Sequence, residues 1–160
     1  MNIIFLDIDG VQNNSCDSDL HCTTEEGGCD FYSPTCVSRL NLLTDITSAR
    51  IVVSSTWRLG ETVESLQIKL KIMGIKAPVI GMTDDLGSNC VRGNEILKWI
   101  KDNIRLLGVD YYHEYKNYVI LDDDTDMLLW QKNNFIHTDG QKGLTWDDVE
   151  LAKGIFNRGE

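Results

Sequence analysis

The chain has 160 residues, of which 42% are hydrophobic and 25% are charged, and these values are ordinary for a globular protein with one core. The formal net charge of -10 argues against a protein that coats nucleic acid through a broad basic face, but allows contact with a strand end. No hydrophobic run approaches the roughly 20 residues of a membrane helix, and the first residues lack the features of a signal peptide. We therefore expect one domain over residues 1–160, no membrane partner and a cytoplasmic location.

Short hydrophobic runs alternate with helical patterns along the whole chain. In chain order, the sequence predicts a strand at 3–6, a helix at 33–48, a strand at 50–54, a helix at 61–74, a strand at 77–82, a helix at 93–108, a strand at 118–122, a helix at 125–134, a short strand at 135–138 and a helix at 145–157. Repeated strand–helix units with hydrophobic strands indicate a parallel sheet covered on both faces. The predicted fold is therefore α/β, a Rossmann-like three-layer sandwich around a mostly parallel sheet of about five strands.

The irregular segment 12–33 is polar and rich in cysteine. Three cysteines lie in this segment and a fourth follows it, with five or six residues between successive ones: Cys16, Cys22, Cys29 and Cys36. In a reducing compartment they are expected to be free thiols or metal ligands rather than disulfides. A small zinc site that includes His21 is an alternative, although the spacing differs from the close cysteine pairs of common zinc modules. Cys36 falls on the helical pattern that follows, and we expect it to be packed.

Polar side chains follow three of the predicted strands at the point where each strand ends. Asp7 and Asp9 follow the first strand, Ser54 and Ser55 the second, and Asp122 and Asp123 the fourth. In open parallel sheets, ligands bind beyond the carboxyl ends of the strands, so these side chains are expected to meet in one crevice. Carboxylates from two strand ends suit Mg²⁺, and serine hydroxyls with a nearby cation suit a phosphate group. The sequence therefore predicts a site for Mg²⁺ and a phosphorylated ligand.

Four segments resemble, in order, the motifs of the haloacid dehalogenase (HAD) superfamily. "FLDIDGV" (5–11) resembles motif I, "IVVSST" (51–56) resembles motif II, and "YVILDDDTDM" (118–127) resembles motif IV. Motif III, a basic residue before or on a helix, is best matched by Arg92 in "VRGNEILKWI". The resemblance covers nearly the whole chain and implies a Rossmann-like phosphatase. About twenty residues after motif I are too few for a full cap domain, so we expect an essentially capless fold with a short flap.

The resemblance also implies a role for each acidic motif residue. Asp7 is the implied nucleophile, which forms an aspartyl-phosphate. Asp9 is implied to protonate the leaving oxygen and later to deprotonate the attacking water. Asp7, the backbone carbonyl of Asp9, and Asp122 or Asp123 are the implied Mg²⁺ ligands. An aspartate rather than serine or threonine at position 9 favours phosphatase over ATPase chemistry in this superfamily.

The phosphate-binding residues follow from the same resemblance. Ser54, together with Ser55, is implied to bind the phosphoryl group, and Arg92 to stabilise its charge, with Lys98 as the alternative cation. Arg58 either reaches the substrate phosphate or pairs with a local acid, and the sequence leaves both possibilities open. Trp57 is expected in the core or the crevice wall, with a base-stacking platform as the alternative.

The finer resemblance points to nucleic acid ends. The motif segments look like the small HAD domains of RNA-repair and phage proteins, and like the 3'-phosphatase domain of phage-type polynucleotide kinase/phosphatase. That domain has lysine at the motif III position, where this chain has Arg92, which makes a more forked and less flexible phosphate contact. The expected substrate is a nucleotide or a nucleic-acid 3'-phosphate end. The alternatives are a small-metabolite or 5'-nucleotide phosphatase, and a non-catalytic module that binds phosphorylated ligands.

Overall fold

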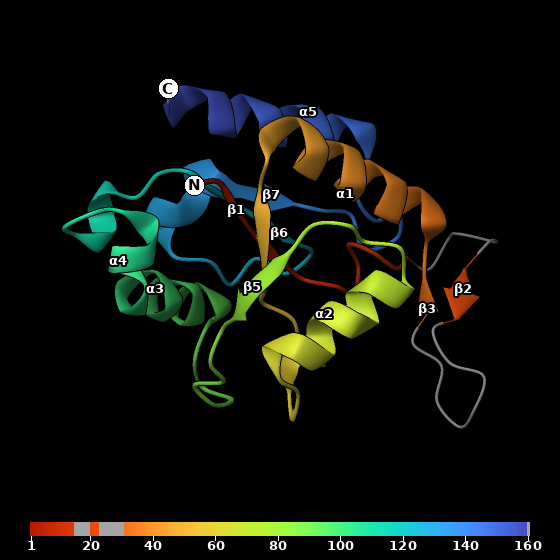
Figure 1. The fold of residues 1–160 in the computed structure, drawn as a ribbon, viewed down its shortest axis with the longest axis horizontal. Helices are drawn as coiled ribbons and strands as arrows, with labels where there is room; N and C mark the ends of the chain where they lie inside the picture. Colours follow the sequence, from red (N-terminus) through yellow and green to blue (C-terminus); the bar gives the residue numbers. More distant parts are fainter. Residues whose placement is uncertain (15–19, 23–30, 160) are drawn as a thin grey trace.

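The centre of the protein is a five-stranded sheet whose strands all run parallel, in the order β5-β4-β1-β6-β7. The computed structural model describes residues 1–14, 20–22 and 31–159. The strands of this sheet are β1 (Ile3–Leu6), β4 (Arg50–Val53), β5 (Val79–Met82), β6 (Tyr118–Asp122) and β7 (Phe135–His137) (Figure 1). Each lies within a few residues of a predicted strand, and the parallel order confirms the predicted α/β fold.

Helices cover both faces of the sheet and complete the three layers. One face packs against α1 (Pro34–Thr47), α2 (Val63–Ile72) and α5 (Trp146–Phe156), and α1 and α5 lie side by side (Figure 1). The other face packs against α3 (Arg92–Asp102) and α4 (Ile104–Leu107). Among the described residues, no helix is long and apolar enough to cross a membrane.

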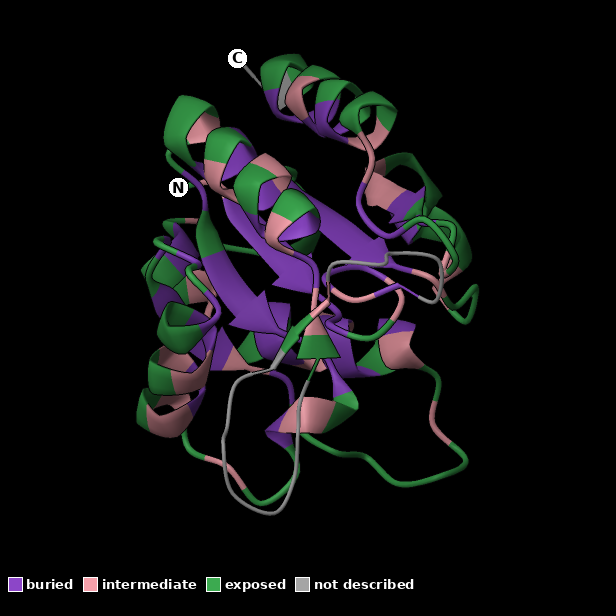
Figure 2. Ribbon diagram, turned by 90° about the vertical axis from the view of Figure 1, so that its right-hand side faces the viewer, coloured by how far each residue is buried: buried purple, intermediate pink, exposed green. Residues whose placement is uncertain are grey.

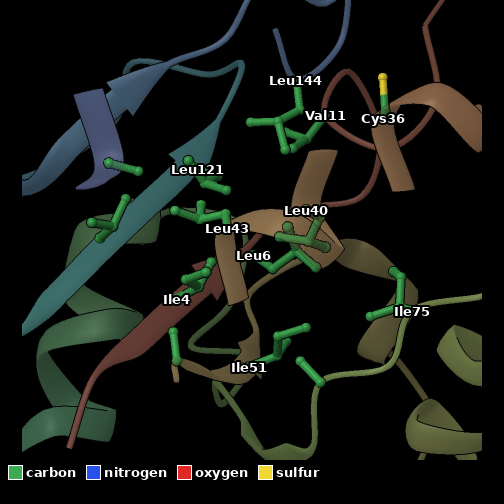
Figure 3. Packing of buried hydrophobic residues seen from close by; sticks show 14 of the residues in the cluster. Ile4, Leu6, Val11, Cys36, Leu40, Leu43, Ile51, Ile75, Leu121 and Leu144 are labelled. Atoms are coloured by element: carbon green, nitrogen blue, oxygen red, sulfur yellow. The ribbon is translucent and has the colours of Figure 1, made fainter. Parts of the chain in front are cut away.

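The hydrophobic core is divided by the sheet into two clusters. Successive side chains of a strand point to opposite faces, so Ile4 and Leu6 of β1 enter the larger cluster, whereas Ile3 and Phe5 enter the smaller one. The central strands β1 and β6 are therefore buried along their whole length, and the strands of the sheet are largely purple in Figure 2. Ile4 and Leu6 lie among the leucines of α1 (Figure 3). This rigid sheet fixes the strand ends at which the polar motif residues stand.

The helix predicted at 125–134 is not found. Instead, a 3-10 helix, η3 (Leu129–Asn134), occupies the second half of this range. The side chain of Gln131 is completely buried, donates to the Gly93 carbonyl at 2.9 Å and accepts from the Leu128 amide at 2.8 Å. The bond to Gly93 ties the segment to α3, and this tertiary contact overrides the helical pattern of the sequence.

The long helix predicted at 93–108 is divided at Asn103. The backbone of Asn103 departs from helical geometry, with φ -113° and ψ 17°, and its side-chain amide donates to the Trp99 carbonyl at 2.8 Å. Asparagine side chains compete in this way with helical backbone bonding. The end of the pattern is as predicted, since Gly108 adopts a left-handed φ of 71° after the second piece.

The flap region contains a short antiparallel pair of strands that the sequence pattern did not predict, β2 (His21–Cys22) and β3 (Phe31–Tyr32). Among the described residues, this pair is the only regular structure between β1 and α1, as expected for a short flap. Cys36 is buried in the core on α1, as predicted. Cys16, Cys29 and the side chain of Cys22 lie outside the described residues, so the zinc alternative stays a prediction.

Candidate active site

The register of the central sheet brings three polar side chains to one place. The last residue of β1 pairs with the last residue of β4 on one side and with Leu121 of β6 on the other. The residues that follow are Asp7, Ser54 and Asp122. The Asp7 amide donates to the Leu121 carbonyl, and the Ser54 amide donates to the Leu6 carbonyl, both at 2.9 Å. The backbone ladder therefore continues through these residues and holds their side chains at the same edge.

Asp7, Asp122 and Asp123 form an acidic triad at this edge. One carboxylate oxygen from each lies within 4.8 Å of the others. Asp7 is 6% exposed and Asp122 only 2%, while Asp123 is more accessible. Oδ1 of Asp122 accepts from the Asp124 amide at 2.9 Å, whereas Oδ2 is buried and has no hydrogen-bond partner among the described residues. Clustered carboxylate oxygens with an unused acceptor fit a hard divalent cation such as Mg²⁺.

Burial raises the pKa of both buried carboxyls in the triad. The pKa of Asp7 rises to about 6, mainly through burial, while the Ser55 hydroxyl, the charge of Arg92 and the Ile8 amide oppose the rise. The pKa of Asp122 rises to about 8, again mainly through burial and then through the charge of Asp7. A bound cation would favour the charged forms of both groups. Binding of a cation at the triad would therefore be coupled to the release of protons from these two groups.

The Asp123 carboxylate is packed against two glycines. A Cβ atom at Gly10 would lie 2.2 Å from Asp123 Oδ2, and one at Gly140 would lie 2.6 Å from the same atom. Gly10 also has a left-handed φ of 70°. Larger residues at either position would displace the carboxylate, so both glycines allow Asp123 to reach the triad.

We expect Gly10→Ala to weaken Mg²⁺ binding by about tenfold, because the new methyl group displaces Asp123 from the triad. Gly60→Ala is the matched control, since Gly60 has a similar φ of 77° but no heavy atom within 4 Å of the position that a Cβ atom would occupy. Isothermal titration calorimetry would measure the Mg²⁺ affinity of both variants. Alanine causes about 1 kcal/mol of backbone strain at either position, so a difference in affinity would not come from strain. Equal Mg²⁺ affinity in both variants would contradict the role given to Gly10.

Ser54 and Ser55 are both buried beside Asp7, at 1% and 0% exposure. The Ser54 hydroxyl has no hydrogen-bond partner among the described residues. The Ser55 hydroxyl caps the 3-10 helix η1 (Thr56–Arg58), where it accepts from the Trp57 amide at 3.4 Å, and its side chain also bonds Asp7. Ser54 therefore has free hydrogen-bonding capacity for a ligand, whereas Ser55 is already used to support the site.

Arg92 is the cation that lies over the triad. Its Nε is 3.6 Å from Asp122 Oδ2, its Nη1 is 3.6 Å from Glu95 Oε2, and its Nη2 is 4.0 Å from Asp7 Oδ1. It begins α3, where its backbone amide donates to Asp126 at 2.7 Å. These distances bring Arg92 together with the acidic motif residues without fixing it in short hydrogen bonds.

Lys98, the alternative cation, forms its ion pairs with acids outside the triad. It pairs with Asp84 at 2.9 Å and also with Asp102, and its side chain is 42% exposed. An exposed lysine with two carboxylate partners on the outside of α3 is an ordinary surface ion pair. The geometry therefore favours Arg92 over Lys98 for contact with a bound phosphate.

Arg58 is buried and its guanidinium contacts protein groups on all three nitrogens. Nε donates to the Thr83 carbonyl at 2.8 Å, Nη1 to the Ser55 carbonyl at 2.7 Å, and Nη2 to Glu95 Oε2 at 2.7 Å. Of the two roles open from sequence, the structure thus places Arg58 against a local acid. Glu95 in turn lies beside Arg92, so the buried pair connects η1 to the cation of the site.

The carboxylate of Asp9 is exposed and is not one of the clustered carboxylates of the triad. It accepts from Asn13 Nδ2 at 2.8 Å and from Trp57 Nε1 at 3.2 Å. Trp57 is half-buried and packs against the larger core cluster, which agrees with the predicted crevice wall. Sequence reasoning missed Asn13 and Glu95 as residues of the site. Asn13 is one polar residue in a polar loop, and Glu95 is an ordinary acid on an amphipathic helix.

A cleft of about 290 Å³ adjoins the site beside Arg92. Four acidic residues contribute to its lining, namely Asp85, Glu95, Asp124 and Asp126, together with two arginines, Arg58 and Arg92. The lining of the cleft is therefore net acidic. Arg58 is already paired with Glu95, so the remaining excess of carboxylates disfavours a second phosphate group in this direction.

Comparison with known proteins agrees with the fold and the motif order. Among curated proteins, no relative matches the chain. One family model matches residues 3–149, a range that includes the acidic triad, both serines and Arg92. The family is described as the HAD domain in Swiss Army Knife RNA repair proteins. Because the match spans nearly the whole chain, this protein belongs to that family of HAD domains.

Proposed function

We propose that the protein is a Mg²⁺-dependent phosphomonoester hydrolase that acts through an aspartyl-phosphate on Asp7. The family implies a phosphatase-type hydrolase. The observation that carries the proposal is a pair of buried oxygens beside Asp7 that have no hydrogen-bond partner among the described residues, namely Ser54 Oγ and Asp122 Oδ2. Buried polar atoms normally have partners, and a phosphate and a cation would supply them here. We also propose that residues 1–160 form one domain that acts in the cytoplasm.

In the first step, a carboxylate oxygen of Asp7 attacks phosphorus as the bond to the leaving oxygen breaks. Asp9 gives its proton to that oxygen, so the alcohol leaves uncharged. In the second step, water attacks the phosphorus of the aspartyl-phosphate, and Asp9 takes a proton from the water. Inorganic phosphate leaves and Asp7 is regenerated, so each of the two carboxyls ends the cycle in its starting state.

The surrounding residues stabilise the phosphoryl group during both steps. Ser54 Oγ donates a hydrogen bond to a phosphoryl oxygen, and Arg92 balances the negative charge at 3.6 to 4.0 Å from Asp122 and Asp7. Mg²⁺ held by the triad and the Asp9 carbonyl would neutralise the carboxylates and polarise the phosphoryl group. Ser55 and Arg58 hold the surrounding groups in place rather than contacting the phosphate. Ser55 bonds Asp7, and Arg58 bonds Glu95 and the Thr83 carbonyl.

We propose a nucleotide or a nucleic-acid 3'-phosphate end as the substrate. The family description names RNA repair, a process that handles phosphorylated strand ends. The acidic cleft beside Arg92 and the net charge of -10 disfavour a long polyanion across the surface. A terminal monoester places only one phosphate at the triad, so it avoids repulsion both from the acidic cleft and from the negative surface.

A substrate panel tests the proposed function. Phosphate release would be measured with and without Mg²⁺ from 3'-phosphorylated RNA and DNA oligomers, 3'- and 5'-mononucleotides and an aryl phosphate. Fastest turnover on a 3'-phosphorylated end is the expected result. Preference for 5'-nucleotides or small metabolites would contradict the proposed substrate class but agree with the proposed phosphomonoester hydrolysis. Folded protein that binds Mg²⁺ but releases no phosphate from any member would contradict the enzyme and favour a binding module.

We expect the metal-free protein to lose stability as the pH rises from about 5 to about 8.5, and Mg²⁺ to restore it. Folding raises the pKa of Asp122 from 3.8 to about 8, so the folded state holds a proton that the unfolded state has already released. Stability therefore falls as pH rises through this window, by on the order of 2–4 kcal/mol. Urea unfolding at several pH values, with and without Mg²⁺, measures the change.

Asp122→Asn provides the control for this prediction. The amide cannot ionise, so the variant should lose most of the pH-dependent fall and most of the stabilisation by Mg²⁺. Two outcomes would contradict the assignment of Asp122 to the cation site. One is a wild-type stability that does not change over this pH range, and the other is equal stabilisation of wild type and variant by Mg²⁺.

A further inference from the structure

Asp9 is exposed, yet two side chains hold its carboxylate. Asn13 Nδ2 donates to Oδ1 at 2.8 Å, and Trp57 Nε1 lies 3.2 Å from both Oδ1 and Oδ2. An exposed aspartate is ordinarily free to change rotamer, and hydrogen bonds from fixed donors restrict it. Among the described residues, the shared Trp57 N–H is the only hydrogen-bond donor to Oδ2, so this oxygen retains a lone pair for a proton.

Both donors are themselves fixed by the surrounding structure. The Asn13 amide oxygen accepts from the Gly10 backbone at 2.8 Å, inside the tight turn that follows β1. The Trp57 ring packs against the larger core cluster, and its backbone amide bonds the Ser55 hydroxyl. The indole N–H is therefore a rigid donor, held by the core on one side and by the η1 turn on the other.

The η1 turn contacts both motif I carboxylates at once. Ser55 bonds Asp7, and Trp57, two residues later, bonds Asp9, which is two residues after Asp7. The parallel pairing of β1 with β4 aligns the two segments and makes these contacts possible. One short turn thus sets the positions of two carboxylates whose relative placement decides whether attack and proton transfer occur together.

We propose that Trp57, assisted by Asn13, is a positioning residue that holds Asp9 for proton transfer to the leaving oxygen. The inference rests on the proposed phosphatase function. The proton on Oδ2 passes to the ester oxygen as its bond to phosphorus breaks and the bond from Asp7 to phosphorus forms. The electron pair of the broken bond takes up this proton, and no further reactant is needed.

This role has a signature that simple structural damage lacks. An alkyl phosphate, such as a ribose 3'-phosphate, releases a strongly basic alkoxide unless it is protonated, whereas an aryl phosphate releases a weakly basic phenolate. General acid catalysis therefore matters much more for the alkyl substrate. A misplaced Asp9 should slow alkyl phosphate cleavage selectively, whereas a damaged nucleophile or phosphate site should slow cleavage of both substrates.

The test compares kcat/KM of Trp57→Phe on a 3'-mononucleotide and on an aryl phosphate. Because kcat/KM covers the steps up to the first irreversible bond cleavage, it isolates the step in which Asp9 acts as acid. The expected result is a loss of about 10- to 100-fold on the 3'-mononucleotide and of less than about threefold on the aryl phosphate. Trp130→Phe, at another half-exposed tryptophan outside the site, should leave both values unchanged.

Asn13→Ala keeps the test valid if Trp57→Phe fails to fold. It should show the same selective loss, and the double variant should lose less than the product of the single losses, because both donors act through Asp9. Equal losses on the two substrates, or no loss on either, would overturn the inference. Wild-type protein that cleaves neither substrate would instead overturn the proposed function, and the inference with it.

Discussion

Replacement of Asp7 by asparagine is expected to reduce phosphate release by at least about four orders of magnitude, because the amide cannot attack phosphorus. Asp7 is buried just after β1, where it is part of the acidic triad and lies 4.0 Å from Arg92 Nη2. Initial rates on the best substrate of the panel would measure the loss. The effect should be the same on alkyl and aryl phosphates, since both need the same attack.

The fold of Asp7→Asn should be intact, and this separates loss of chemistry from loss of structure. Burial raises the pKa of Asp7 to about 6, so the charged form destabilises the metal-free protein at higher pH. The variant should therefore be more stable than wild type at about pH 8, by about 1–3 kcal/mol. Asp45→Asn, an exposed change on α1, should alter neither activity nor stability. Full activity in Asp7→Asn would contradict the assignment of the nucleophile.

Truncation of Glu95 to alanine is expected to lower the free energy of unfolding by about 3–5 kcal/mol, because it leaves the buried charge of Arg58 without its partner. The two side chains meet at 2.7 Å and are 7% and 5% exposed. Glu95 also accepts from the Leu86 amide at 3.2 Å and lies 3.6 Å from Arg92. Its loss therefore affects the loop before α3 and the cation of the site together.

Urea unfolding of three variants would measure this contribution. Glu95→Gln keeps the volume and the bond to Leu86 but not the charge, so it should cost less than Glu95→Ala. Glu150→Ala removes an exposed partner of Lys153, a pair that bonds at 2.8 Å, and should change stability by less than about 0.5 kcal/mol. A cost below about 1 kcal/mol for Glu95→Ala would show that the buried pair does not support the site.

The parts of the fold that local pattern determines were predictable from sequence. The helix predicted at 33–48 is α1, which begins at Pro34 and is capped by the Ser33 side chain. Asp7, Ser54 and Asp122 were predictable as neighbours, because residues that follow hydrophobic parallel strands must meet at one edge of the sheet. Their roles came from the motif resemblance, and the family match supports the resemblance without testing each role.

The parts that depend on distant contacts were not predictable. Glu95 meets Arg58 across 37 residues of sequence, and nothing local distinguishes it from other helical acids. Gln131 bonds Gly93 across 38 residues, and this contact replaces the expected helix with η3. Trp57 reaches Asp9 only because β1 and β4 pair in a particular register. Such contacts follow from packing, which hydrophobic pattern alone does not specify.

The most direct test of the central claim is to trap the phosphoryl group on Asp7. Wild-type protein would be mixed with Mg²⁺ and a 3'-mononucleotide that carries a radioactive phosphate, and the reaction would be quenched in acid during turnover. The protein would then be digested and the labelled peptide identified. The expected result is label on the peptide that contains Asp7, removable by hydroxylamine and absent from Asp7→Asn. Turnover without label on Asp7, under conditions in which phosphate release is slower than bond cleavage, would contradict the covalent mechanism.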